Sequence, residues 1–146
     1  MKKLAFVLTL GVVLLSCSEE DPEIIDSSMP QGDFAVSASG NFVAQNDTGS
    51  SGMVETGVDS EGTSFVHFAD DFETVLATGT VTVFLSTSSE ASFDPGSGNP
   101  DVLLIGNVSM NGEQYFRLNE APAAKYTHVI LWCASAGIPF GYAEIQ

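Results

Sequence analysis

Short apolar runs separated by turn-forming residues recur along most of the chain. In Thr80–Ser86 the apolar residues Val81, Val83 and Leu85 fall at every second position, so they share one face of an extended segment. Val, Thr and Phe are frequent in these runs, and the chain has no heptad pattern, internal repeat or second long apolar span. Short strands at this spacing predict a single all-β domain over residues 33–146, built as an antiparallel β-sandwich or a closed β-barrel.

Turn signals in the first half of the domain predict two pairs of strands. Residues 59–62 (DSEG) predict the turn of a hairpin whose arms are Gly52–Val58 and Thr63–Phe68. Before this hairpin, Asp33–Ala44 contains apolar residues on both sides of a predicted turn at Ser39–Asn41. This half of the domain is therefore expected to fold as a meander of short antiparallel strands.

The second half of the domain contains the most hydrophobic runs. Val102–Val108 is almost continuously apolar and predicts a strand that is buried on both faces. Asn111-Gly112 is a strong hairpin signal, and Gln114–Leu118 is the predicted returning arm. Tyr126–Ile145 predicts a strand pair that closes the domain, whereas Thr87–Pro100 is rich in Ser, Gly and Pro and predicts a long loop.

Acidic residues greatly outnumber basic ones. The chain has 19 Asp and Glu against four Lys and Arg, which gives a formal net charge of −15. Such a surface repels phosphate backbones, so nucleic acid is not expected as a partner. A protein surface, a cation or a polar matrix fits this charge better, and solubility alone also explains it.

Residues 1–16 have the organisation of an export signal. Lys2 and Lys3 supply a positive start, and Leu4–Leu15 is an apolar stretch that is too short for a comfortable membrane span. The stretch runs into Ser16-Cys17 and resembles a bacterial lipoprotein signal, which is cleaved directly before the cysteine. The resemblance implies a lipid on Cys17 that holds the chain to a membrane. The alternative is a plain secretory signal that leaves Cys17 as an ordinary thiol.

Residues 17–32 predict the lipid anchor and a flexible acidic tether before the domain. Ser18-Glu19-Glu20-Asp21 follows the cysteine, and two prolines with several serines complete the segment. Serine in this place resembles outer-membrane sorting in Gram-negative lipoproteins, and the acidic run resembles the surface-export tag of some of them. We therefore expect an outer-membrane lipoprotein on the periplasmic face or the cell surface. The simpler interpretation of the acidic run is a charged spacer.

Cys133 is the candidate residue for redox chemistry. It lies in His128–Cys133, where Val129, Leu131 and Cys133 share one face of the predicted strand. An unpaired cysteine in an exported protein is notable because oxidising compartments tend to pair thiols, and a lipidated Cys17 would leave Cys133 without a partner in the chain. The competing interpretation is a small buried hydrophobe whose thiol is inert.

The segment around this cysteine resembles the signature of the DM13 domain, the "electron transfer DM13" family. The residues that carry the resemblance at the closing strands are Tyr126, Val129, Ile130, Trp132, Cys133, Phe140, Gly141, Ala143 and Ile145. Upstream segments fall in the family's order, namely Ser39–Phe42, Ser51-Gly52, Phe68 with Phe72, Val83–Ser86 and Gly112–Tyr115. The resemblance covers the chain from about Ala38 to the C-terminus.

The resemblance implies electron transfer or thiol redox chemistry through Cys133, either as a bare thiol or through a bound group such as haem. In a haem site Cys133 would be a thiolate ligand, and His67 or His128 would be the second ligand. There is no Cys-x-x-Cys-His attachment motif, and either histidine alone is more often a surface or hydrogen-bonded residue. The chain departs from the family pattern at Thr78-Gly79-Thr80, where a Gly-Pro-Asp-like segment is usual, and between Cys133 and Phe140.

Other chemistry has weak support in the sequence. Asp70, Asp71 and Glu73 carry oxygens that could ligate Ca²⁺, but a solvated loop is the better explanation of them, and no metal site is predicted. No Ser/His/Asp order, phosphate loop or carboxylate pair indicates an enzyme. We therefore expect a cell-envelope redox accessory that meets a redox or surface protein. The alternative is a non-catalytic binding or adhesion module in which Cys133 only fills the core.

Overall fold

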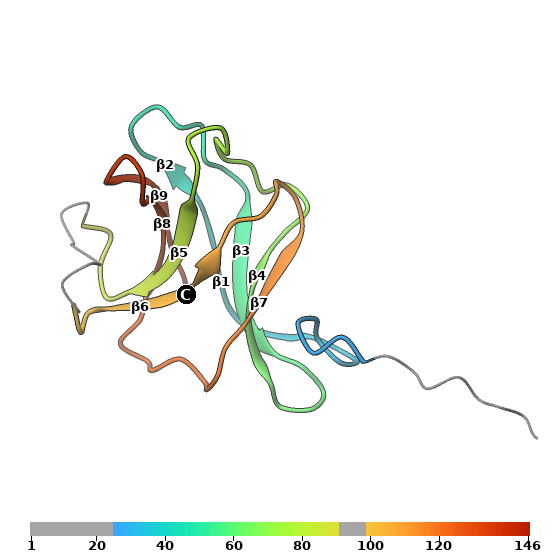
Figure 1. The fold of residues 1–146 in the computed structure, drawn as a ribbon. Coiled ribbons are helices and arrows are strands. Elements are labelled where there is room, and N and C mark those ends of the chain that lie inside the picture. Colours follow the sequence, from blue (N-terminus) through green and yellow to red (C-terminus); the bar gives the residue numbers. More distant parts are fainter. Residues whose placement is uncertain (1–24, 91–98) are drawn as a thin grey trace, which may run out of the picture.

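The computed structural model describes residues 25–90 and 99–146 (Figure 1). Across these two ranges the chain forms nine strands and no helix, and the strands make two antiparallel sheets. The prediction of a single all-β domain is thus confirmed. Of the two predicted architectures the chain adopts the sandwich, because the strand order gives two separate sheets with free edges.

The four-stranded sheet has the order β1-β3-β4-β7. Its strands are β1 (Ala35–Asn41), β3 (Met53–Val58), β4 (Ser64–Phe68) and β7 (Gln114–Arg117). The predicted hairpin around residues 59–62 is the β3–β4 pair, in which Val54 pairs with Phe68 and Val58 with Ser64.

The five-stranded sheet has the order β2-β9-β8-β5-β6. Its strands are β2 (Val43–Ala44), β5 (Val81–Ser86), β6 (Val102–Asn107), β8 (His128–Cys133) and β9 (Ile138–Glu144). The closing pair predicted in Tyr126–Ile145 is the β8–β9 hairpin.

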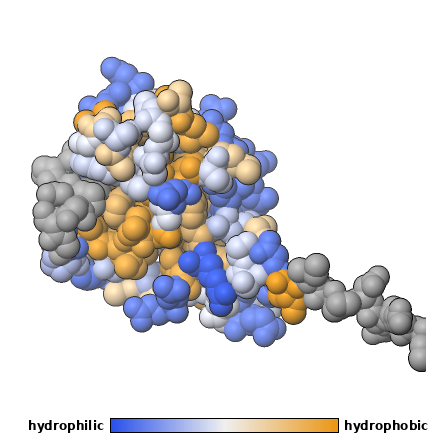
Figure 2. Space-filling model, in the orientation of Figure 1, coloured by the Kyte–Doolittle hydropathy of each residue, from blue (hydrophilic) through white to orange (hydrophobic). Residues whose placement is uncertain are grey.

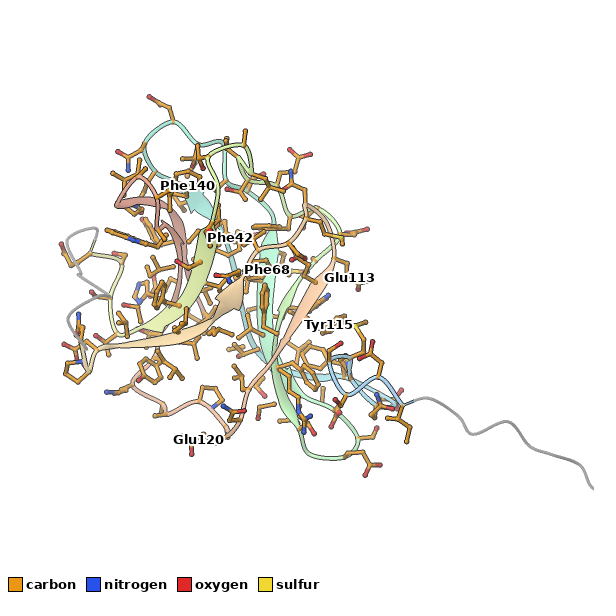
Figure 3. All side chains as sticks on the ribbon, in the orientation of Figure 1. Phe42, Phe68, Glu113, Tyr115, Glu120 and Phe140 are labelled. Carbon is orange, nitrogen blue, oxygen red and sulfur yellow. The ribbon has the colours of Figure 1, made fainter. Side chains whose placement is uncertain are left out.

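Apolar side chains from both sheets meet between the layers. Phe42 lies where the chain leaves β1 for β2, and it contacts Phe68 of β4 with ring centroids 5.1 Å apart. Phe72, which follows β4, is fully buried and its ring lies 4.4 Å from that of Phe68. Figure 3 shows Phe42 and Phe68 between the two layers. Burying one such side chain contributes roughly 1.5–3 kcal/mol, so this aromatic group is a main source of the sandwich's stability.

The alternating residues predicted in Thr80–Ser86 face this core. Val81, Val83 and Leu85 all belong to the hydrophobic core and are essentially inaccessible to solvent. The opposite face of the same sheet is also partly buried, because Phe84 and Ile130 are at most 6% exposed. The central strands of this sheet are therefore covered on both sides.

Three predictions about local structure were wrong. Val102–Val108 does not form a strand buried on both faces, because β6 is an edge strand that pairs with β5 alone in the described part of the chain and exposes two leucines. Gln114–Leu118 does not return against it, since β7 pairs with β4 in the other sheet. The predicted turn at Ser39–Asn41 is the extended end of β1. In the first two cases the strand formed, but its neighbours were set by tertiary packing, and at Ser39–Asn41 pairing with β3 prevailed over the local turn preference.

The chain that precedes β1 contacts the domain. Gln31 N–H donates to the Asp59 carboxylate at 3.0 Å, and Asp33 N–H donates to Ser60 Oγ at 2.9 Å. Phe34 packs edge-on against Phe65 with centroids 6.5 Å apart. The described end of the predicted tether, residues 25–32, thus runs to the β3–β4 turn. Within the described ranges, no helix is long and apolar enough to cross a membrane.

Candidate functional site

Cys133 is the last residue of β8, a central strand with β5 on one side and β9 on the other. It pairs with Val81 of β5 and with Ile138 of β9. The side chain points into the core together with Val129 and Leu131, as the alternation of the strand predicted, and it is 0% exposed. Cys133 is a free thiol, and it has no cysteine partner in the described ranges.

The turn after β8 brings a hydroxyl back to the sulfur. Gly137 N–H donates to the Cys133 carbonyl at 2.8 Å, which closes the turn, and Gly137 has a φ of 66° that favours glycine. Ser135 therefore lies over the strand end, with its Oγ 3.3 Å from Cys133 Sγ. The same hydroxyl donates to the Thr78 carbonyl at 2.6 Å, so Ser135 is held in place by the segment before β5.

A second hydroxyl reaches the sulfur from the segment that leads into β5. Thr78 Oγ1 lies 3.6 Å from Cys133 Sγ and accepts a hydrogen bond from the thiol. Ala134 N–H donates to the Thr80 carbonyl at 3.1 Å and fixes the two segments together. The departure from the family pattern at Thr78-Gly79-Thr80 thus lies directly beside Cys133.

The hydrogen bonds to Cys133 outweigh the effect of its burial. Desolvation alone raises the pKa of the Cys133 thiol, because a charged thiolate is disfavoured away from water. The side chains of Ser135 and Thr78, and the backbone N–H groups of Ala136 and Ser135, stabilise the thiolate and bring its pKa below the ordinary value of a cysteine. The geometry therefore favours ionisation of a sulfur that solvent does not reach.

Ionisation requires a rearrangement of hydroxyl hydrogens around the sulfur. The thiol has one hydrogen, which it donates to Thr78 Oγ1. The Ser135 hydrogen is engaged by the Thr78 carbonyl while the thiol is neutral, and because Ser135 Oγ lies 3.3 Å from the sulfur it can turn to donate to the thiolate. Once the thiol proton leaves, the Thr78 hydroxyl can rotate and donate to the thiolate, which has only acceptor capacity. Thr78 is thus the group whose hydrogen bond changes direction with the charge of Cys133.

Sequence reasoning missed Thr78 and Ser135 as partners of Cys133. Ser135 carried a weak signal, since a hydroxyl two residues after a strand end can fold back in a turn. Thr78 carried none, because it is 55 residues away in the chain. Only the pairing of β5 with β8 brings it to the sulfur.

His128 lies at the opposite end of β8 from Cys133. Cys133 follows His128 by five positions, which corresponds to about 16 Å along a strand. Its Nδ1 is 2.9 Å from Thr127 Oγ1, and its ring lies 6.3 Å from that of Tyr142. His128 is therefore placed against neighbouring surface residues and away from the candidate thiol.

His67 lies in the other sheet, where its ring joins an aromatic and acidic cluster. Its Nδ1 is 2.9 Å from a Glu55 carboxylate oxygen, and its Nε2 is 3.2 Å from Glu113 Oε1. The ring stacks on Tyr115 with centroids 4.2 Å apart and an interplanar angle of 11°, and Phe34 meets both rings edge-on. Figure 3 shows Tyr115 on β7 and Glu113 directly before that strand. Both ring nitrogens of His67 are thus already engaged.

These positions do not fit a haem held by Cys133 and a histidine. His128 lies at the far end of the strand, and His67 lies in the opposite sheet between two carboxylates. The Cys133 sulfur is enclosed by core residues and by hydroxyl groups, so an iron atom would have to displace these contacts. The chemistry that the arrangement supports is that of the sulfur itself.

The acidic crossover after β4 has a structural role. Asp71 Oδ1 accepts a hydrogen bond from Met53 N–H at 2.9 Å, and Ser51 pairs with Glu73 in an isolated bridge. No group of three or more His, Cys, Asp or Glu side chains in residues 25–90 and 99–146 is arranged to hold a metal ion. Cys17 and the predicted export signal lie outside the described residues, as does most of the predicted loop Thr87–Pro100.

Comparison with known proteins places this site in a family context. A family model described as "Electron transfer DM13" matches residues 41–145, which includes the whole of β8, β9 and Cys133. No curated protein and no solved structure matches the chain.

Proposed function

The chain belongs to the electron transfer DM13 family, and from this premise we propose that its domain passes electrons through the Cys133 sulfur. The observation that carries the proposal is the set of hydrogen bonds that lowers the pKa of a fully buried thiol. A thiolate gives up an electron far more readily than a thiol, so a lowered pKa is what a one-electron relay at sulfur requires.

The proposed step is a one-electron oxidation. The thiol of Cys133 releases its proton to solvent through the Ser135 turn, and the thiolate gives one electron to an oxidised redox protein. The sulfur becomes a thiyl radical while the acceptor is reduced by one electron. A second redox protein then returns one electron, and the radical becomes the thiolate again. Burial of the sulfur protects the radical from coupling with another thiol.

Voltammetry of the adsorbed protein tests the proposal. The full chain with Cys17→Ser has Cys133 as its one thiol, and Cys133→Ala in that background is the matched control. We expect an electron wave in the first protein whose potential falls as pH rises toward the thiol pKa, and no such wave in the control. Identical traces from the two proteins would remove Cys133 from any redox role.

The second candidate function is a non-catalytic binding module. The observation in its favour is that Cys133 is 0% exposed and is a full member of the hydrophobic core. In that account Cys133→Ala costs only packing energy, roughly 1 kcal/mol or slightly more, and every other property of the folded protein is unchanged. The voltammetric comparison separates the two functions, since only the redox account ties electron exchange to this sulfur.

We further propose that the protein is an outer-membrane lipoprotein anchored through Cys17. The support is the order of Lys2-Lys3, an apolar stretch and Ser16-Cys17 at the start of the chain. Mass spectrometry of the protein expressed in a Gram-negative host should find a mature chain that begins at an acylated Cys17. A mature chain that keeps a free Cys17 would support the plain secretory signal instead.

A further inference from the structure

β6 is an exposed apolar edge strand next to the buried central strands β5 and β8 of its sheet. Leu103 and Leu104 are 40% and 60% exposed, although they belong to a strand. β6 pairs with β5 on one side, and no strand in the described ranges lies on its other side. Exposed apolar edge strands offer both side chains and free backbone groups to a partner, and proteins normally blunt them with charges or proline. β6 carries neither.

The pairing with β5 shows which backbone groups of β6 face outward. Thr87 N–H donates to the Asp101 carbonyl at 3.1 Å, and the register pairs Leu85 with Leu103 and Phe84 with Leu104. In an antiparallel ladder hydrogen-bonded and non-hydrogen-bonded pairs alternate, so Leu103 bonds to β5 and Leu104 does not. The N–H and C=O of Leu104 therefore point away from the sheet.

A hollow lies beside this edge. It has a volume of about 120 Å³ and is lined by three consecutive residues of β6 and by the end of β7 with the chain that follows it, namely Leu103, Leu104, Ile105, Arg117, Leu118, Asn119 and Glu120. Figure 1 shows that β6 and β7 come together at one end and diverge toward the other. Figure 2 shows apolar surface over β6 and in the opening between the two strands. The opening thus combines a free strand edge with a place for apolar side chains.

We propose that an extended segment of a basic partner protein adds to β6 as a sixth strand and fills this hollow. The charge of the chain selects the partner, because 19 acidic residues face four basic ones and a second copy of the chain would carry the same excess. Acidic residues also flank the site, with Asp101 directly before β6 and Glu120 at the hollow. Both basic residues of the described ranges also lie here and are engaged by backbone carbonyls, Arg117 with that of Ser27 at 3.5 Å and Lys125 with that of Pro100 at 2.7 Å. Backbone pairing supplies the affinity, and the acidic excess of the chain as a whole supplies the preference for a basic segment. This inference does not depend on the redox role of Cys133.

The test uses a synthetic peptide of alternating Val and Thr between two pairs of lysines. Two control peptides carry glutamates in place of the lysines, or N-methyl groups on alternate backbone amides. Binding to the full chain with Cys17→Ser is followed by fluorescence anisotropy, and hydrogen exchange at the Leu104 amide is followed by NMR. Leu104→Lys removes the apolar contact and adds a like charge for the peptide, whereas Val36→Lys, at a 49% exposed residue of edge strand β1, is the matched control variant.

We expect the lysine-flanked peptide to bind the parent chain and Val36→Lys equally, to protect the Leu104 amide, and to bind Leu104→Lys at least about tenfold more weakly. Both control peptides should bind more weakly than the lysine-flanked one. Leu104→Pro serves as a second variant, because it removes an outward N–H only and retains the β5 pairing. Absence of saturable binding, or equal binding to Leu104→Lys, would overturn the proposal. A concentration-dependent dimer that Leu104→Lys abolishes would overturn it in favour of a second copy, and binding to anionic lipid vesicles through β6 in favour of a membrane.

Discussion

β8 and β6 lie on either side of β5 in the same sheet, yet their environments are opposite. Both have six residues, and both come from strongly apolar runs of the sequence. β8 has β9 on its other side and its core-facing residues are fully buried, whereas β6 has no second neighbour among the described residues and exposes Leu104. The comparison teaches that the composition of a strand does not fix its burial. Burial is set by the strands and loops that lie beside it.

The same contrast separates the two proposed roles of the molecule. The Cys133 side chain of β8 is buried, and hydroxyl and N–H groups from neighbouring segments surround its sulfur. β6 instead presents leucines and unpaired backbone groups to solvent. The proposed redox chemistry therefore lies at the buried strand β8, and the proposed binding of a partner lies at the exposed strand β6.

Proline substitution should produce the largest difference in stability between variants of β8 and variants of β6. Ile130→Pro in β8 removes a backbone donor in a strand that pairs on both sides, and it should cost about 3 kcal/mol or more and prevent folding. Leu104→Pro in β6 removes a donor that faces away from β5, so the loss should be roughly 1 kcal/mol or less. Urea unfolding followed by Trp132 fluorescence measures both. Equal losses would mean that β6 is paired on its outer side.

Alanine substitution should separate the strands by their side chains. The Leu131 side chain in β8 is 0% exposed, so Leu131→Ala leaves a cavity in the core. It should lower the free energy of unfolding by about 2–5 kcal/mol. Leu104→Ala in β6 removes a side chain that is 60% exposed and should change it by roughly 0.5 kcal/mol or less. Thermal unfolding of the two variants checks the difference, and a large loss for Leu104→Ala would show that β6 is covered in solution.

Stability against pH gives a smaller effect that belongs to β8 alone. The folded chain holds the pKa of Cys133 below its ordinary value, so the folded state favours the thiolate. This contribution is present in full above the pKa of the unfolded chain and is lost as pH falls through the lower pKa of the folded chain. Between these two values the stability of the parent should rise with pH relative to Cys133→Ala. A parallel pH dependence for the two proteins would show that the thiol does not ionise in the folded state.

The all-β fold could be predicted from the sequence, whereas the neighbours of several strands could not. The β3–β4 and β8–β9 hairpins follow from turn residues and from alternation, both of which are local. The position of β6 at an edge could not be predicted, because an apolar run looks the same at an edge and in the centre of a sheet. The pairing of β7 with β4 was also hidden, since Asn111-Gly112 marks a turn without showing that the chain crosses to the other sheet there.

The central residue of the candidate site was predicted from the sequence, whereas the residues that surround its sulfur were missed. Cys133 and the direction of its side chain follow from the alternation of β8 and from the resemblance of the closing strands to a known family. Thr78 and Ser135, which hold the sulfur, come from a distant segment and from a turn. The lowered pKa depends on these contacts and therefore could not be inferred from the residues around Cys133.

The most direct test of the central claim is the thiolate absorbance of Cys133 in the ultraviolet as a function of pH. The Cys17→Ser chain is titrated folded and in urea, and Ser135→Ala is titrated alongside it. We expect the thiolate to form at lower pH in the folded chain than in the unfolded one, and Ser135→Ala to move the folded titration toward higher pH because a hydrogen bond to sulfur is lost. A folded chain that ionises at or above the pH of the unfolded chain would contradict the account and leave Cys133 as a core residue.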